Sequence, residues 1–191
     1  MPKQEVDIVA AFATASVLTV EDDPIVRADL RLILEDAGFD VCPDARDGVE
    51  AVELAREHRP DVILIDLNLP RLGGVEATRQ ILSERAVPIV ALTGHRTGCV
   101  ERALEAGAVA HVLKPFHDGH LVETLAGVLA DRAEAGAEAE HRHHLIMIER
   151  MVRDGYSERE IAAAVEGDDS RFQDVGILHA VSAHIRAMLG R

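Results

Sequence analysis

The chain has 191 residues, enough for one ordinary domain and a small second one. Its formal net charge of −14 at pH 7 argues against broad, non-specific binding of nucleic acid. Its two cysteines stand in no metal-binding or redox spacing, and no secretory leader or bilayer-spanning apolar stretch is read from the pattern, so we expect a cytoplasmic protein that does not contact the membrane.

Five short apolar runs predict strands, and segments with helix signals separate them. Capping residues Asp23 and Asp47 begin the first two predicted helices, the second in capping-box fashion with Glu50, and Gly74, Thr97 and Asp118 begin three more. Continuous apolar strands that alternate with helices predict an α/β fold with a doubly wound parallel sheet. The predicted strands lie near residues 16–20, 39–42, 61–65, 87–92 and 109–113.

Polar side chains follow four of these predicted strands. The first ends in the acid pair Glu21 and Asp22, the third in Asp66, the fourth in Thr93 and the fifth in Lys114. Functional groups collect at the carboxyl ends of parallel strands, so we expect these side chains to lie together. Acidic residues after strands are also common helix caps, the role expected of the neighbouring residue Asp23.

Residues 15–132 resemble a receiver (CheY-like) domain of the two-component response-regulator family. The resemblance rests on four motifs in the family's order and spacing. It implies a five-stranded sheet of order 2-1-3-4-5 and a cis peptide bond between Lys114 and Pro115. The motifs are Val20-Glu21-Asp22-Asp23-Pro24, Asp66-Leu67-Asn68-Leu69-Pro70, Thr93-Gly94 and Lys114-Pro115-Phe116.

The resemblance implies a role for each of these polar residues. Asp66 would accept a phosphoryl group from a histidine kinase or phosphotransfer protein, and Thr93 and Lys114 would contact the phosphoryl oxygens. A carboxylate that attacks a phosphohistidine meets strong charge repulsion, which a hard, oxygen-ligated cation relieves. The expected cofactor is Mg²⁺, with Glu21, Asp22, Asp66 and the backbone carbonyl of Asn68 as ligands.

The same resemblance implies no metabolic enzyme, only phosphotransfer to the chain itself and slow autodephosphorylation. A phosphatase of the dehalogenase type would carry its catalytic Asp after the first strand, whereas Asp66 follows the third. One residue departs from the family. His111 stands three residues before Lys114, where the family has Tyr or Phe, and it is either a switch residue that works with Thr93 or a side chain without a signalling role.

The remaining segments predict the domain organisation. We expect an N-terminal extension at residues 1–14, the receiver domain at 15–132, a helical connector at 133–144 and a small all-helical output domain at 145–191. The connector is rich in Ala and Glu, which favours helix, and Gly136 is its expected break.

Two pieces of the tail, residues 151–162 and 181–185, look like parts of a LuxR-type helix-turn-helix, although they lie farther apart than in that family. This second resemblance implies transcriptional regulation through DNA binding. From residue 138 onward, however, the tail carries seven Arg against ten acidic residues, whereas DNA binding needs positive charge. The alternative is a tail for dimerisation or for docking a protein partner, and a homodimer is expected. The candidate DNA contacts are Ser182, His184, Arg186 and Arg191.

Overall fold

The computed structural model describes residues 14–94, 98–153 and 160–161. The chain divides into two compact units, Met1–Arg132 and Ala133–Arg191. Several predictions lie outside the described residues. They are residues 1–13 of the expected extension, the helix start at Thr97, and most of the expected output domain with Ser182, His184, Arg186 and Arg191.

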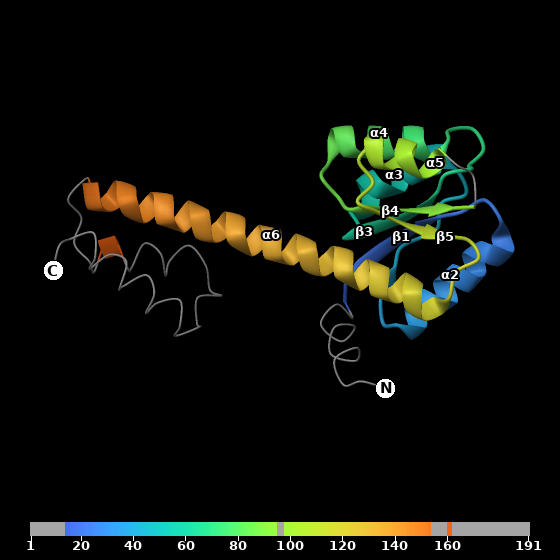
Figure 1. The fold of residues 1–191 in the computed structure, drawn as a ribbon, viewed down its shortest axis with the longest axis horizontal. Coiled ribbons are helices and arrows are strands. Elements are labelled where there is room, and N and C mark those ends of the chain that lie inside the picture. The colour runs from blue at the N-terminus through green and yellow to red at the C-terminus, as the bar shows by residue number, and fades with distance from the viewer. Residues whose placement is uncertain (1–13, 95–97, 154–159, 162–191) are drawn as a thin grey trace. The chain divides into compact units, whose positions relative to one another are not determined.

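A five-stranded parallel sheet forms the centre of the first unit (Figure 1). The strand order is β2-β1-β3-β4-β5, and every neighbouring pair is parallel. The predicted doubly wound fold and its strand order are therefore confirmed. The strands are β1 (Ser16–Val20), β2 (Asp40–Val41), β3 (Val62–Asp66), β4 (Ile89–Thr93) and β5 (Ala110–Leu113).

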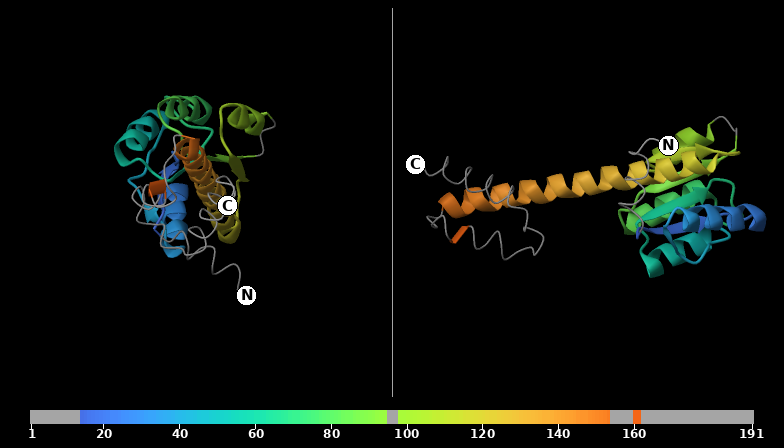
Figure 2. Two further views of the ribbon diagram at one scale, coloured as in Figure 1. Left: turned by 90° about the vertical axis from the view of Figure 1, so that its left-hand side faces the viewer. Right: turned by 90° about the horizontal axis from the view of Figure 1, so that it is seen from below.

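Helices cover both faces of this sheet. Three of them, α3, α4 and α5, lie side by side over one face, while α2 and the first part of α6 lie on the other (Figures 1 and 2). This arrangement places the loops that follow the strands along one edge of the sheet. The helices are α2 (Pro24–Asp36), α3 (Gly48–His58), α4 (Gly74–Glu84), α5 (Cys99–Glu105) and α6 (Asp118–Arg153).

Burial on both faces explains the unbroken apolar runs. In β3, Ile63 and Ile65 pack among the side chains of α3 and α4, and Val62 and Leu64 pack among those of α2 and α6. All four are fully buried. Because consecutive strand residues point to opposite faces, a strand that is covered twice has no polar face to display. Its first polar side chain, at Asp66, therefore marks where the strand reaches the functional edge.

Capping differs from the sequence prediction in one detail. The Asp23 carboxylate accepts hydrogen bonds from the amides of the first turn of α2, and Asp47 does the same for α3 through Val49 N (2.9 Å) and Glu50 N (3.1 Å). The predicted capping box at α3 is wrong in its second half. Glu50 Oε2 accepts from the amide of Arg46 (3.0 Å), one residue before the cap, and also contacts the Arg46 guanidinium.

The predicted helix break at Gly136 is also wrong, because α6 continues through that residue to Arg153. Residues 131–139 are exposed, and a Cβ at Gly136 would touch nothing within 4 Å, so packing does not require a break there. A glycine inside a helix costs about 1 kcal/mol relative to alanine. The surrounding alanines and glutamates, which are good helix formers, offset that cost.

In the second unit, the described residues form one small apolar contact. Ile148 and Ile161 are buried against each other, with Met147 and Met151 packed beside them. Across the described residues, the helices are too short or too polar to cross a membrane.

Candidate functional site

Three carboxylates meet at the carboxyl edge of the sheet. Glu21 and Asp22 directly follow β1, and Asp66 is the last residue of the neighbouring strand β3. One oxygen from each carboxylate lies within 4.8 Å of the other two. Glu21 is 2% exposed and Asp66 is 6% exposed, whereas Asp22 faces solvent. The prediction that the strand ends bring these acids together is confirmed.

Lys114 offsets part of the negative charge of the two buried acids. Its Nζ donates hydrogen bonds to Glu21 Oε2 and to Asp66 Oδ2. Burial opposes the charge on Lys114, but the bonds to the two carboxylates prevail and raise its pKa. Burial raises the pKa of Glu21, and the neighbouring charge of Asp66 adds to that effect, while Lys114 acts against it. The site therefore holds more negative charge than its one lysine balances, which favours a second cation.

Thr93 and Lys114 are joined through their backbones at the ends of β4 and β5. The Lys114 N–H donates to the Thr93 carbonyl at 2.8 Å. The Thr93 hydroxyl is buried and donates to the Gly94 carbonyl at 2.8 Å. The peptide bond between Lys114 and Pro115 is cis, as the resemblance implied.

Two groups that hold the acids in place were not foreseen from the sequence. The backbone N–H of Asn68 donates to Asp66 Oδ1 at 2.8 Å, so Asn68 orients the carboxylate in addition to the carbonyl role that was predicted for it. Arg27 Nη1 donates to the carbonyls of Glu21 (2.7 Å) and Asp22 (3.2 Å), which ties the acidic loop to the first turns of α2. No sequence motif marks Arg27, because its partners are main-chain atoms.

Gly74 brings the start of α4 against the site. A Cβ at this position would lie 2.0 Å from the Asp66 carbonyl oxygen and 2.8 Å from the Leu67 Cα. Only glycine lets the helix approach β3 this closely. The sequence predicted Gly74 as a helix start, and the contact with the backbone of Asp66 is the additional reason for glycine there.

His111 lies on the sheet face that α5 covers, beside Ala91 of β4. Its side chain is exposed. On the same face of the sheet, a buried cluster joins β4 to α5 and includes Ala91, Ala103, Ala106 and Ala108. The role of His111 as a switch stays a prediction.

Residues 17–126 match the response regulator receiver domain family, and the chain belongs to that family. Over 110 residues it is 42% identical to the transcriptional regulatory protein PdtaR of Mycobacterium tuberculosis, a match that covers 57% of this chain and 54% of that protein. The match thus spans about half the length of this curated relative.

Solved structures agree with this assignment. The receiver domain of a Pseudomonas aeruginosa PAO1 sensor histidine kinase, with a magnesium ion coordinated in its active-site cleft, is 36% identical, with a TM-score of 0.58 over 61% of this chain and 98% of that one. A LuxR-family two-component response regulator from an Aurantimonas species is 40% identical, with a TM-score of 0.58 over 62% of this chain and 86% of that one.

The prediction of Mg²⁺ as the cofactor is confirmed. Receiver domains bind Mg²⁺ at an acidic site, and the carboxylates of Glu21, Asp22 and Asp66 fit such an ion. Mg²⁺ prefers hard oxygen ligands and keeps several of its waters. Two buried carboxylates beside one exposed carboxylate provide both the ligands and access to solvent.

Proposed function

We propose that this chain is a response regulator that accepts a phosphoryl group on Asp66 from a partner histidine kinase or phosphotransfer protein. The observation that carries the proposal is the contact of Lys114 Nζ with both Glu21 and Asp66, at an edge where three carboxylates converge. A carboxylate pair bridged by a lysine offers a nucleophile, a cation site and a fixed positive charge for the incoming phosphate.

The described side chains account for the positioning that phosphoryl transfer needs. Asn68 N–H holds Asp66 Oδ1, which fixes the direction of attack. The bond between an Asp66 carboxylate oxygen and phosphorus forms as the bond between phosphorus and the partner's histidine nitrogen breaks, with the imidazole as leaving group. Lys114 already touches Asp66, so it meets a phosphoryl oxygen without a large movement. Glu21, Asp22, Asp66 and the Asn68 carbonyl would hold Mg²⁺, which would supply charge neutralisation for the transfer.

The chain acts only on its own phosphoryl group in this proposal. Water attack on the aspartyl phosphate returns the free carboxylate, so the phosphorylated state is transient. No second substrate is implied, and the protein is a switch and not a metabolic enzyme.

The switch that we propose begins at Thr93. Its hydroxyl leaves the Gly94 carbonyl, donates instead to a phosphoryl oxygen, and opens space on the α5 side of β4. His111, exposed above the small side chains beneath α5, can then move inward. Phosphorylation thereby shifts the population between two arrangements of the surface formed by α5, β5 and the start of α6.

The output of this switch is the C-terminal helical region, for which we keep two alternatives. Transcriptional regulation is supported by two similar proteins, the transcriptional regulatory protein PdtaR and the LuxR-family two-component response regulator. Dimerisation or docking of a protein partner is supported by the net negative charge of the tail. The apolar contact of Ile148 with Ile161 is expected under either alternative, because each needs a folded tail.

The phosphoacceptor proposal is tested by intact-mass measurement after incubation with phosphoramidate and Mg²⁺. We expect one added phosphoryl group on the wild type and none on Asp66→Asn with an unchanged circular dichroism spectrum. A phosphorylated Asp66→Asn protein would reject Asp66 as the acceptor. Omission of Mg²⁺ should abolish the modification, and full modification in EDTA would reject the cation's role.

Light scattering and DNA-binding measurements on the beryllofluoride-activated chain distinguish the two output alternatives. Sequence-dependent DNA binding that appears on activation supports the first alternative. A change of mass on activation without DNA binding supports the second. Asp66→Asn serves as the control in both measurements, because it cannot form the aspartyl phosphate mimic.

A further inference from the structure

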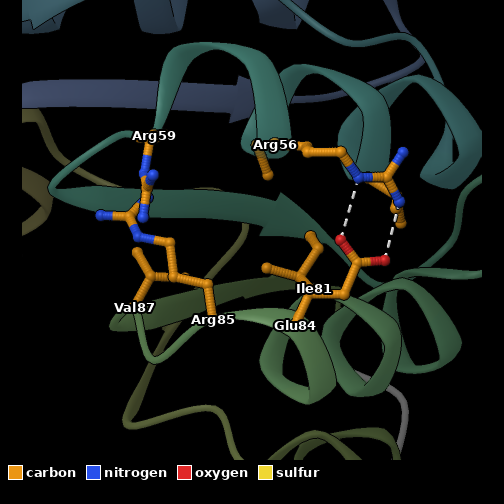
Figure 3. Close-up of a pocket in the computed structure, with 8 residues that line it drawn as sticks. Arg56, Arg59, Ile81, Glu84, Arg85 and Val87 are labelled. Carbon is orange, nitrogen blue, oxygen red and sulfur yellow. Dashed lines mark hydrogen bonds and ion pairs between the residues drawn. The ribbon is translucent and has the colours of Figure 1, made fainter.

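A pocket lies at the opposite edge of the sheet from Asp66, where α3 and α4 end and β4 begins (Figure 3). Its volume is about 180 Å³. Three arginines, Arg56, Arg59 and Arg85, line it together with Glu84, and aliphatic side chains of α3 and α4 complete the wall. We call it the Arg59–Arg85 pocket. The phosphoacceptor site described above uses none of these residues.

The charges in this pocket do not balance. Arg56 and Glu84 form a two-bond pair, Nε to Oε2 at 3.0 Å and Nη2 to Oε1 at 2.7 Å, which neutralises both groups (Figure 3). Within the described part of the chain, neither Arg59 nor Arg85 has such a carboxylate partner. Two positive charges therefore stand at one end of the pocket in a protein whose net charge is −14.

Arg85 also carries an unused donor. Its Nη2 donates to the Pro60 carbonyl at 2.8 Å, but its Nη1 is buried and has no hydrogen-bond partner among the described residues. Burial lowers the pKa of Arg85, and the positive charges of Arg132 and Arg59 act in the same direction. A buried guanidinium nitrogen without an acceptor is costly, and an anion beside it removes that cost.

The C-terminal ends of α3 and α4 balance only part of the positive charge of Arg59 and Arg85. Arg59 caps the end of α3 and Arg85 caps the end of α4, and each helix C-terminus carries a partial charge of about −0.5. Two such ends contribute roughly one negative charge against two guanidinium groups. Asp61 and Arg132 also act on Arg85, with opposite signs, so about one positive charge is left for a ligand to neutralise.

We propose that the Arg59–Arg85 pocket binds a small phosphate-bearing anion, either inorganic phosphate or the phosphate of a mononucleotide. Guanidinium groups bind phosphate and carboxylate oxygens through two parallel N–H bonds, and phosphate brings the higher negative charge and a third oxygen for a second arginine. Arg59 is exposed and supplies one such fork from the rim. Arg85 Nη1 is buried without a partner and Nη2 bonds to Pro60, so a turn of the guanidinium would be needed to present Nη1 to the same ligand. This proposal does not depend on phosphorylation at Asp66.

The test uses the full-length Asp66→Asn chain in EDTA, so that neither the phosphoacceptor nor a metal ion contributes. Inorganic phosphate, adenosine monophosphate and acetate are titrated separately by calorimetry and by amide chemical-shift mapping. We expect saturable binding of at least one phosphate compound, shifts around Arg59, Asp61, Arg85 and Val87, and weaker binding of acetate. Tighter binding of the nucleotide than of phosphate identifies a nucleotide site, and equal binding identifies a phosphate site.

Two variants and one matched control decide where the anion binds. Arg59→Asn removes one charge and keeps a residue that tolerates the left-handed backbone at this position (φ 49°). Arg85→Gln removes the other charge. Each should weaken phosphate binding by about tenfold or more, the effect of losing a charged hydrogen bond.

Arg46→Gln removes an exposed arginine outside the pocket and should bind phosphate as tightly as the parent chain. Each variant is compared only after its unfolding transition has been shown to be cooperative. The proposal is overturned if the parent chain binds no phosphate compound, if the chemical shifts move only around the acidic site, or if all three variants bind alike.

Discussion

The amide of Lys114 donates a hydrogen bond to the carbonyl of Thr93 at 2.8 Å, so Thr93, the last residue of β4, and Lys114, directly after β5, are tied together through the main chain. Lys114 Nζ extends from this point to Asp66 and Glu21. A change in the position of either residue is therefore passed to the other. The proposed switch at Thr93 and the charge on Lys114 act as one unit.

Lys114→Ala tests this unit. The substitution leaves two buried carboxylates without their cation, and we expect the free energy of unfolding to fall by about 1–3 kcal/mol near neutral pH. We also expect slower phosphoryl uptake and no beryllofluoride-induced shift of the Thr93 and His111 amides. Wild-type shifts in the variant would contradict the coupling. Arg46→Gln, an exposed charge away from the site, is the control for general loss of positive charge.

Asp22 and Asp23 are adjacent acids with different roles. Asp22 belongs to the carboxylate cluster, whereas the Asp23 carboxylate caps α2 through Ile25 N at 2.8 Å and Val26 N at 3.3 Å. Asp22→Ala should weaken Mg²⁺ binding by about tenfold or more, as expected when a charged ligand is lost. Asp23→Ala should cost about 1 kcal/mol of stability and leave Mg²⁺ binding nearly unchanged. Calorimetric titration and urea unfolding distinguish the two, and a reversed pattern would show that the assignments are exchanged.

Gly74→Ala tests the packing of α4 on the backbone of Asp66. Because the added Cβ meets main-chain atoms at 2.0 Å, we expect a loss of about 1–3 kcal/mol in the free energy of unfolding and reduced phosphorylation. Gly127→Ala is the matched control, since a Cβ there touches nothing within 4 Å and the residue lies in α6. That change should stabilise the protein by about 0.5–1 kcal/mol. Equal stability of the two variants would disprove the close approach.

The lowered pKa of Asp47 predicts that the free energy of unfolding depends on pH. Burial opposes its ionisation, but the amides of Glu50 and Val49 and the Arg71 guanidinium prevail and hold its pKa below the ordinary value of 3.8. A group with a lowered folded pKa stabilises the protein above its unfolded pKa and loses that contribution as the pH falls through the folded pKa. Its contribution should therefore be complete above about pH 5 and should shrink as the pH falls below the ordinary value of 3.8 and through the lowered folded pKa.

Asp47→Asn isolates this charge, because asparagine still caps a helix. At pH 7 the variant should be less stable by about 1 kcal/mol, and the difference should shrink in acid. Urea unfolding followed by circular dichroism measures it, since the chain has no tryptophan. A difference that stays constant from pH 7 to the acid limit would contradict the lowered pKa.

Local patterns were sufficient to predict the sheet and the acidic cluster. An apolar run that ends at Asp66 indicates both a buried strand and the edge where its functional group lies. The roles of Arg27 and Asn68 could not be predicted, because these residues act through main-chain atoms that only the folded loops bring together. The same holds for Glu50, whose carboxylate bonds to the amide of Arg46 and not to that of the cap residue Asp47.

At Gly136 a local signal predicted a helix break that does not occur, because α6 is continuous there. Glycine lowers helix propensity at one position, but the alanines and glutamates around it favour helix over many positions. A single helix breaker is thus weak evidence for a boundary where no turn residue or buried contact supports it.

The central claim is that Asp66 carries the phosphoryl group. The most direct measurement is reduction of the phosphorylated full-length chain with borohydride, which converts an aspartyl phosphate to homoserine, followed by peptide mass mapping. We expect homoserine at position 66 alone, dependent on Mg²⁺ and on the phosphoryl donor. Homoserine at another aspartate, or a phosphoryl group found on a histidine with residue 66 unmodified, would contradict it.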